Sequence, residues 1–182
     1  YMCIPHGIYK NIPVSMEDGL DASHKFLEDA QKTLDACVYG LDDAKIQIMQ
    51  LVAQWIANPE ATGTAIGIWG PPGTGKTSLV KDGISKILGR DFAFIPLGGT
   101  SDAASLEGHS YTYEGSQPGK LVTCLAQNKS MNLVFYFDEL DKVSETPRGD
   151  EIIGILTHLT DTTQNQQFHD TYFAEVDFDL SR

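Results

Sequence analysis

Apolar residues recur along the chain with two different spacings. Helical spacing, with apolar positions every three or four residues, runs through residues 21–36, 41–56, 76–88, 118–128 and 150–159. Continuous apolar runs of strand length occupy 65–69, 92–97 and 133–137. Such strands, alternating with helices, are typical of a parallel sheet covered by helices on both faces. The pattern therefore predicts an α/β fold, with further strands or a hairpin in residues 168–180.

The first nineteen residues differ from the rest. They contain Pro5, Gly7, Pro13 and Gly19 and show no sustained periodicity, so we interpret residues 1–19 as an irregular lead-in or linker. Residues 20–182 are long enough for one domain with a substantial core.

A glycine-rich segment joins the apolar run at 65–69 to the helical pattern at 76–88. It fits the phosphate-loop pattern Gly-x-x-x-x-Gly-Lys-Thr, with a strand expected before it and a helix after it. Backbone N–H groups of such a loop point at phosphate oxygens, and the helix N-terminus adds positive charge there. Lys76 would reach the β- and γ-phosphates of ATP, and Thr77 would bind Mg²⁺. The predicted ATP-binding residues of this segment are Gly70, Pro71, Pro72, Gly73, Thr74, Gly75, Lys76, Thr77 and Ser78.

Two adjacent carboxylates follow the apolar run at 133–137. Asp138 and Glu139 stand at the carboxyl end of this predicted strand, where ligands bind in open α/β sheets. Asp138 is expected to hold the Mg²⁺ shell, usually through water, and Glu139 to orient and polarise the attacking water. The predicted catalytic residues are therefore Glu139 and Lys76.

Charge and composition exclude several classes of protein. The formal net charge of −12 argues against binding to duplex nucleic acid, which needs clustered Lys and Arg. No apolar run approaches the roughly 20 residues of a membrane-spanning helix. The three cysteines are Cys3, Cys37 and Cys124, and they lack metal-ligand spacing, so we expect reduced thiols and an intracellular compartment.

Together the two motifs resemble those of AAA+ ATPases. Several further segments resemble the ATPase module of Lon proteases in particular, over roughly residues 12–182. These segments are 39–41, 97–99, 108–109, 118–119, 138–142, 148–150, 164–170 and 177–181. The resemblance implies an AAA+ large subdomain with a P-loop NTPase fold. It also implies that the sensor residues, the arginine finger and a peptidase domain lie beyond Arg182. We therefore expect residues 20–182 to be truncated before sensor 1, leaving the sheet incomplete on its C-terminal side.

The resemblance implies roles for further residues. Tyr39 and Gly40 would line the adenine pocket. The loop at 108–119 would be a pore loop that grips unfolded polypeptide, with Tyr113 as the gripping aromatic residue. Glu114 departs from the family pattern, which has an aliphatic residue there, and Tyr111 stands where a basic residue is common.

The resemblance also implies how the whole protein works. It would be an ATP-driven motor that unfolds or translocates polypeptides as a ring, with a hexamer expected, and that feeds a peptidase domain. Its compartment would be the cytoplasm or the mitochondrial matrix. Two alternatives stay open at this point: a remodelling AAA+ ATPase without a protease, and a nucleotide-binding assembly scaffold.

Overall fold

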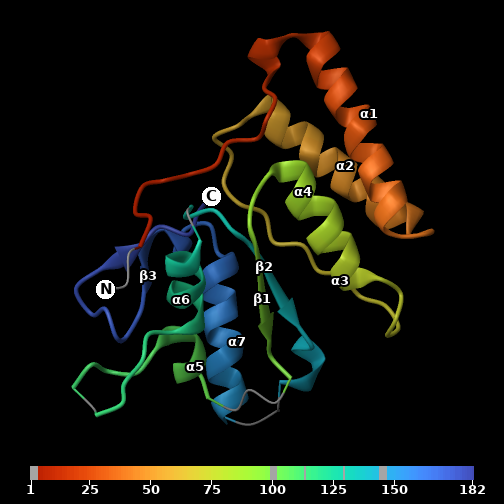
Figure 1. Cartoon of the computed structure of the whole chain (residues 1–182). Coiled ribbons are helices and arrows are strands. Elements are labelled where there is room, and N and C mark those ends of the chain that lie inside the picture. The colour runs from red at the N-terminus through yellow and green to blue at the C-terminus, as the bar shows by residue number, and fades with distance from the viewer. Residues whose placement is uncertain (1–3, 99–101, 113, 129, 144–146) are drawn as a thin grey trace. The chain divides into compact units, whose positions relative to one another are not determined.

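The computed structural model describes residues 4–98, 102–112, 114–128, 130–143 and 147–182 (Figure 1). The chain divides into two compact units. One unit contains residues 10–61 and 66–92, including the phosphate loop, and is called the loop unit below. The other contains residues 4–9, 62–65 and 93–182 and is called the sheet unit. Each unit is described by itself.

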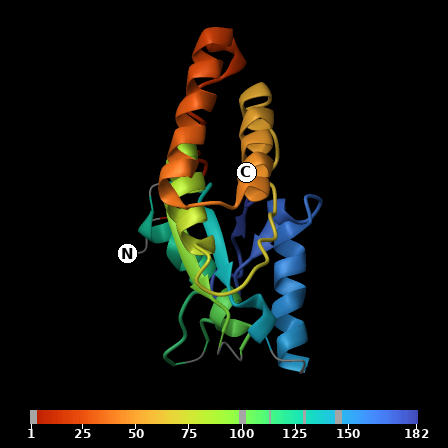
Figure 2. The same ribbon diagram turned by 90° about the vertical axis from the view of Figure 1, so that its right-hand side faces the viewer.

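The loop unit is built from helices. A short 3₁₀ turn, η1 (Met16–Asp18), leads into α1 (Leu20–Cys37), and α2 (Asp42–Ala57) follows. These two helices lie side by side, as Figures 1 and 2 show. A third helix has three parts: α3 (Lys76–Ser78), the π-helical η2 (Leu79–Ile84) and α4 (Ser85–Leu88). It packs on α1, and its end at the left-handed Gly89 confirms the predicted helical stop.

Helical periodicity accounts for the core of the loop unit. The predicted stripes place Leu34, Val52 and Leu79 in full burial, and the other buried apolar residues share their helix faces. Gly83 fits this packing because a Cβ there would lie 2.9 Å from Leu34 Cδ2. One charged group is buried here: Lys45 donates to Asp35 at 3.0 Å and so joins α2 to α1. The hydrogen bond from Lys45 lowers the pKa of Asp35.

The two longest strands among the described residues are β1 (Phe92–Pro96) and β2 (Val134–Asp138), which are neighbours in one sheet. Apart from Phe92, which belongs to the loop unit, they lie in the sheet unit. The Leu97 N–H, just past β1, donates to the carbonyl of Asp138, the last residue of β2, at 2.9 Å. The carboxyl ends of both strands therefore meet, as in a parallel pair. Phe94 and Tyr136 stack on one face of this pair with centroids 5.9 Å apart, and Phe135 and Phe137 on the other, 6.4 Å apart.

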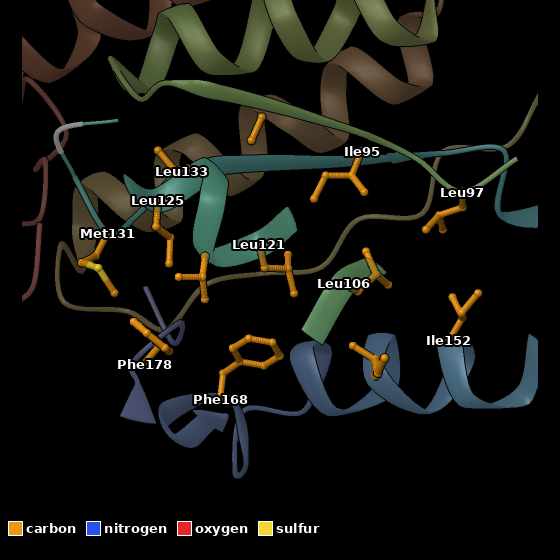
Figure 3. Close-up of a cluster of buried hydrophobic side chains, with 13 residues drawn as sticks. Ile95, Leu97, Leu106, Leu121, Leu125, Met131, Leu133, Ile152, Phe168 and Phe178 are labelled. Atoms are coloured by element: carbon orange, nitrogen blue, oxygen red, sulfur yellow. The ribbon is translucent and has the colours of Figure 1, made fainter. Parts of the chain in front are cut away.

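Helices cover one face of this sheet. They are α5 (Ala104–Glu107), α6 (Lys120–Gln127) and α7 (Pro147–Thr160), with short 3₁₀ turns η3 (Leu140–Lys142) and η4 (Asn165–Gln167). The strands β3 (Phe168–His169) and β4 (Asp177–Phe178) pair antiparallel, which confirms the expected pairing in residues 168–180. Figure 3 shows the core between sheet, helices and hairpin, with Ile95, Leu106, Leu121, Ile152 and Phe168 pointing into it.

One predicted strand is wrong. Residues 65–69 form no strand, and most of the segment is exposed: Ile66 is 39% and Trp69 98% exposed. The main sheet consists of β1 and β2, and no strand among the described residues pairs with residues 65–69. An apolar run becomes a strand only when a neighbour satisfies its backbone N–H and C=O groups, so the pattern alone was insufficient here.

The segment from residue 4 to residue 9 packs against the rest of the sheet unit. The Ile8 carbonyl accepts the Met131 N–H at 2.7 Å, and the Tyr9 hydroxyl donates to Asp179 at 3.4 Å. Burial, followed by the Asp179 carboxylate, raises the pKa of Tyr9. The boundary between a lead-in and a domain at residues 19 and 20 stays a prediction. None of the helices within the described ranges is both long and apolar enough to cross a lipid bilayer.

Candidate nucleotide site

The phosphate loop is a curled, irregular segment that ends in a helix. Gly73 and Gly75 have φ values of 76° and 86°, in the left-handed region that favours glycine. Gly75 is the N-cap of α3, and its carbonyl accepts the Leu79 N–H at 2.9 Å. The glycines thus turn the chain so that a helix begins directly at Lys76, as the motif predicts.

The side chains of this loop bind its own backbone. Lys76 Nζ donates to the carbonyls of Gly70 and Pro71, each at 2.8 Å. Thr74 Oγ1 donates to the Pro71 carbonyl at 3.0 Å. The ammonium group therefore lies at the start of the loop, and these two bonds use two of its three donors. A cationic side chain therefore lies against the backbone of the loop.

The segment predicted to line the adenine pocket lies against the phosphate loop. Val38 is buried, and a Cβ at Gly75 would lie 3.1 Å from its Cγ2. The next residue, Tyr39, is fully exposed. Gly40 and Leu41 both have positive φ, 72° and 57°, and Leu41 caps α2. The structure therefore brings Tyr39 and Gly40 close to the phosphate loop within one unit, with the aromatic ring exposed.

Leu41 is a feature that sequence reasoning missed. A non-glycine residue in the left-handed region costs about 1 kcal/mol, and such residues gather at functional sites. Gly40 before Leu41 indicates a tight turn, but nothing in the sequence predicts a left-handed backbone conformation for Leu41 itself.

The two carboxylates predicted to act on Mg²⁺ and water lie at the end of β2. Asp138 is the last residue of the strand, and its Oδ1 accepts the Glu139 N–H at 3.1 Å and the Tyr136 hydroxyl at 3.4 Å. These donors fix the orientation of the Asp138 carboxylate. A fixed carboxylate at a strand end suits an oxygen-preferring cation, as Mg²⁺ is.

Glu139 has an unusual backbone and a close neighbour. Its φ is 58°, it is exposed, and it caps η3. Its side chain lies over Gly98, where a Cβ would be 2.9 Å from Glu139 Cδ and 3.2 Å from its Cβ. Glycine at 98 thus leaves the space that the Glu139 carboxylate occupies. Gly98 was not predicted as a site residue, although a glycine directly after an apolar strand was the available signal.

Lys76 and Thr77 belong to the loop unit, whereas Asp138 and Glu139 belong to the sheet unit. The structure brings together Tyr39, Gly40 and the phosphate loop in the first, and Asp138, Glu139 and Gly98 in the second. Tyr113, the predicted gripping aromatic, lies outside the described residues.

A pocket of about 440 Å³ opens in the sheet unit. It contains none of the predicted site residues and is lined by Ala103, Glu107, Glu151, Gly154, Ile155, His158, Gln167, Phe168 and His169. Burial raises the pKa of Glu107, and the nearby His158 partly opposes this. His169 is exposed and bonds Asp177 at 3.1 Å.

Comparisons with known proteins agree with these motifs. Residues 66–174 match the family described as the ATPase family associated with various cellular activities (AAA). The chain is 40% identical over 178 residues to a Lon protease homolog of Acanthamoeba polyphaga mimivirus, covering 97% of this chain and 17% of the relative. It is 40% identical over 165 residues to a mitochondrial Lon protease homolog of Phaeodactylum tricornutum, covering 90% and 18%. A Lon protease of Halothermothrix orenii is 41% identical over 156 residues, covering 86% and 20%.

The chain spans about a fifth of the length of these relatives. The family match includes the phosphate loop and the Asp138–Glu139 pair, and the relatives match across both units. The chain therefore belongs to the AAA family of ATPases and is an ATPase module of the Lon type.

Proposed function

We propose that this chain binds ATP at the phosphate loop and hydrolyses it with Asp138 and Glu139. The observation that carries the proposal is the curled loop at 70–76, in which Lys76 donates to the carbonyls of Gly70 and Pro71. Residues 70–78 would bind the phosphates through N–H groups, and Tyr39 and Gly40 would contact the adenine.

The remaining roles follow from the chemistry of the donors. Thr77 and Asp138 would hold Mg²⁺, which neutralises charge on the β- and γ-phosphates when bound. Hydroxyl and carboxylate oxygens suit this hard cation, and the Asp138 carboxylate is fixed by two donors. Glu139 would accept a proton from the attacking water, and Gly98 leaves the space that its carboxylate occupies.

We propose further that the hydrolysis drives polypeptide unfolding or translocation in a ring, with a hexamer expected, beside a peptidase domain outside this sequence. The names of the relatives support this proposal. Residues 20–182 would be the large AAA+ subdomain, with sensor residues elsewhere in the protein, and Tyr113 would contact the polypeptide. The compartment would be intracellular: the cytoplasm, or the mitochondrial matrix as for the Phaeodactylum relative.

ATPase assays of the full-length protein test the proposal. Glu139→Gln is expected to retain ATP binding and to lower turnover by about 10² to 10⁴, because the carboxylate that accepts the proton is gone. The matched control is Glu175→Gln, another exposed glutamate. Equal phosphate release from wild type and Glu139→Gln would refute the role of Glu139. ATP binding without turnover in the wild type would favour an assembly scaffold.

A further inference from the structure

The loop at 108–119 leaves one short helix and enters the next. It begins at Gly108, the C-cap of α5, and ends at Gly119, the N-cap of α6. Its two stems touch: a Cβ at Gly108 would lie 2.8 Å from the Gly119 nitrogen. The His109 N–H also donates to the Gln117 carbonyl at 3.0 Å. The base of the loop is therefore narrow and closely packed.

A segment some fifty residues later holds both stems. Asp170 follows β3 and is 0% exposed. Its Oδ2 accepts the Gly119 N–H at 2.9 Å, and its Oδ1 accepts the Tyr172 N–H at 2.9 Å. The adjacent Thr171 N–H donates to the Glu107 carbonyl at 2.7 Å. One stem is thus bound through Glu107 and the other through Gly119.

The two glycines make this arrangement possible. Gly108 has a φ of 85°, and a Cβ there would lie 2.8 Å from Asp170 Oδ1. A Cβ at Gly119 would lie 2.6 Å from the Leu106 carbonyl carbon. Side chains at either position would displace the carboxylate or separate the stems. Since a buried carboxylate is costly unless it is hydrogen-bonded, Asp170 and the loop base stabilise each other.

The tip of the loop differs from its base. Tyr111 is 65% exposed, and beyond the Ser110–Thr112 hydroxyl pair at 2.9 Å the described tip residues have few partners. A fixed base with an exposed tip can transmit the movement of the unit to whatever the tip contacts.

We propose that Asp170 is a positioning residue for polypeptide handling, which fixes the base of the 108–119 loop to the β3–β4 segment. This inference rests on the proposed function of that loop. Asp170 contacts no nucleotide-site residue among those described, so it acts on the loop and not on ATP. Loss of its carboxylate is expected to separate polypeptide handling from ATP hydrolysis.

The test compares Asp170→Asn with Asp161→Asn in the full-length protein. Asp161 makes the same kind of turn, accepting the Thr163 N–H at 2.9 Å, but it is not fully buried and is not bonded to either stem of the 108–119 loop. Asparagine at 170 keeps one carbonyl acceptor for two N–H groups. We expect amide exchange of Gly119 to accelerate at least about tenfold, since one buried donor loses its partner. Exchange at 73–80 and ATPase activity without polypeptide should stay within about twofold of wild type.

Processing of an unfolded casein substrate is the functional measurement. Asp170→Asn should slow it several-fold relative to its own ATPase rate, and Asp161→Asn should not. Unchanged exchange at Gly119, or equal loss of ATPase and processing, would overturn the inference. Wild-type protein that never processes casein would refute the proposed motor function. Exchange of the Gly119 amide would still test whether Asp170 fixes the base of the loop.

If Asp170→Asn does not fold, amide exchange of the wild-type protein tests the inference. The Gly119 amide must then exchange at least about tenfold more slowly than the amides of Ser110 and Tyr111, because it is bonded to a fully buried carboxylate. Equal rates would overturn the inference.

Discussion

The phosphate loop at 70–76 and the loop at 108–119 both lead into a helix, but different bonds hold them. The first is fixed from within: Lys76 and Thr74 donate to carbonyls no more than six residues away. The second is fixed from outside by Asp170, 51 residues beyond Gly119. The difference teaches that a local motif can specify a loop whose bonds are local, whereas a loop held by distant residues needs the fold.

The largest effect is expected from Lys76→Ala. It removes the cation that the phosphate loop holds in place, so ATP affinity should fall at least about 100-fold, since charge-assisted bonds to phosphate are lost. Lys81→Ala is the matched control, an exposed lysine in the same helix. Binding of a fluorescent ATP analogue measures both. Near-normal affinity of Lys76→Ala would mean that backbone N–H groups and helix alone bind the phosphates.

A second substitution tests whether the close contact with Gly98 positions the Glu139 side chain. Gly98→Ala puts a Cβ against the Glu139 side chain, so turnover should fall about tenfold while KM changes little, because a small displacement of a catalytic group is costly. Gly67→Ala has open space around its Cβ and should leave steady-state kinetics unchanged. A rise in KM without a change in kcat would show that Gly98 contributes to substrate binding.

The packed base of the 108–119 loop predicts a contrast in stability. Gly119→Ala should destabilise the protein by about 1–3 kcal/mol, because its Cβ meets the backbone of Leu106 and Glu107. Gly154→Ala, inside α7 with open space, should stabilise by up to about 1 kcal/mol. Urea unfolding followed by circular dichroism measures both. Similar stability of the two variants would contradict the close contact of the stems.

The smallest effect concerns the stem residue Glu107. Burial raises its pKa, so folding favours the protonated form and ionisation destabilises the native state as pH rises above the ordinary value. Glu107→Gln should therefore raise the melting temperature slightly at pH 7.5, and this gain should vanish near pH 4. Exposed Glu175→Gln should show no such trend. A gain in melting temperature that grows as the pH falls would contradict the raised pKa of Glu107.

How much the sequence predicts follows from the range of the interactions. The helix at 76–88, the glycines before it and the strands at 92–96 and 134–138 depend on neighbouring residues, and all were predicted. The turn at Gly40 and Leu41 also lies next to its helix, yet the left-handed leucine was missed because leucine rarely adopts that conformation.

Long-range partners account for the remaining differences. Residues 65–69 have the composition of a strand, but strand formation depends on a partner that composition does not reveal. Asp170 was part of a family resemblance only, because its contact partners, the Gly119 N–H and the 107–108 stem, lie far away in sequence. Gly98 and Glu139 likewise meet only after β1 and β2 have paired.

The exposure of Trp69 has a spectroscopic consequence. The chain contains two tryptophans, Trp55 and Trp69, and the second is 98% exposed and directly precedes the phosphate loop. In a Trp55→Phe background its emission should be red-shifted and readily quenched by acrylamide. Any strand that pairs with residues 65–69, or any nucleotide that orders the loop, should shift the emission to the blue and slow the quenching. The emission of Trp69 would therefore report both on strand pairing of residues 65–69 and on ATP binding.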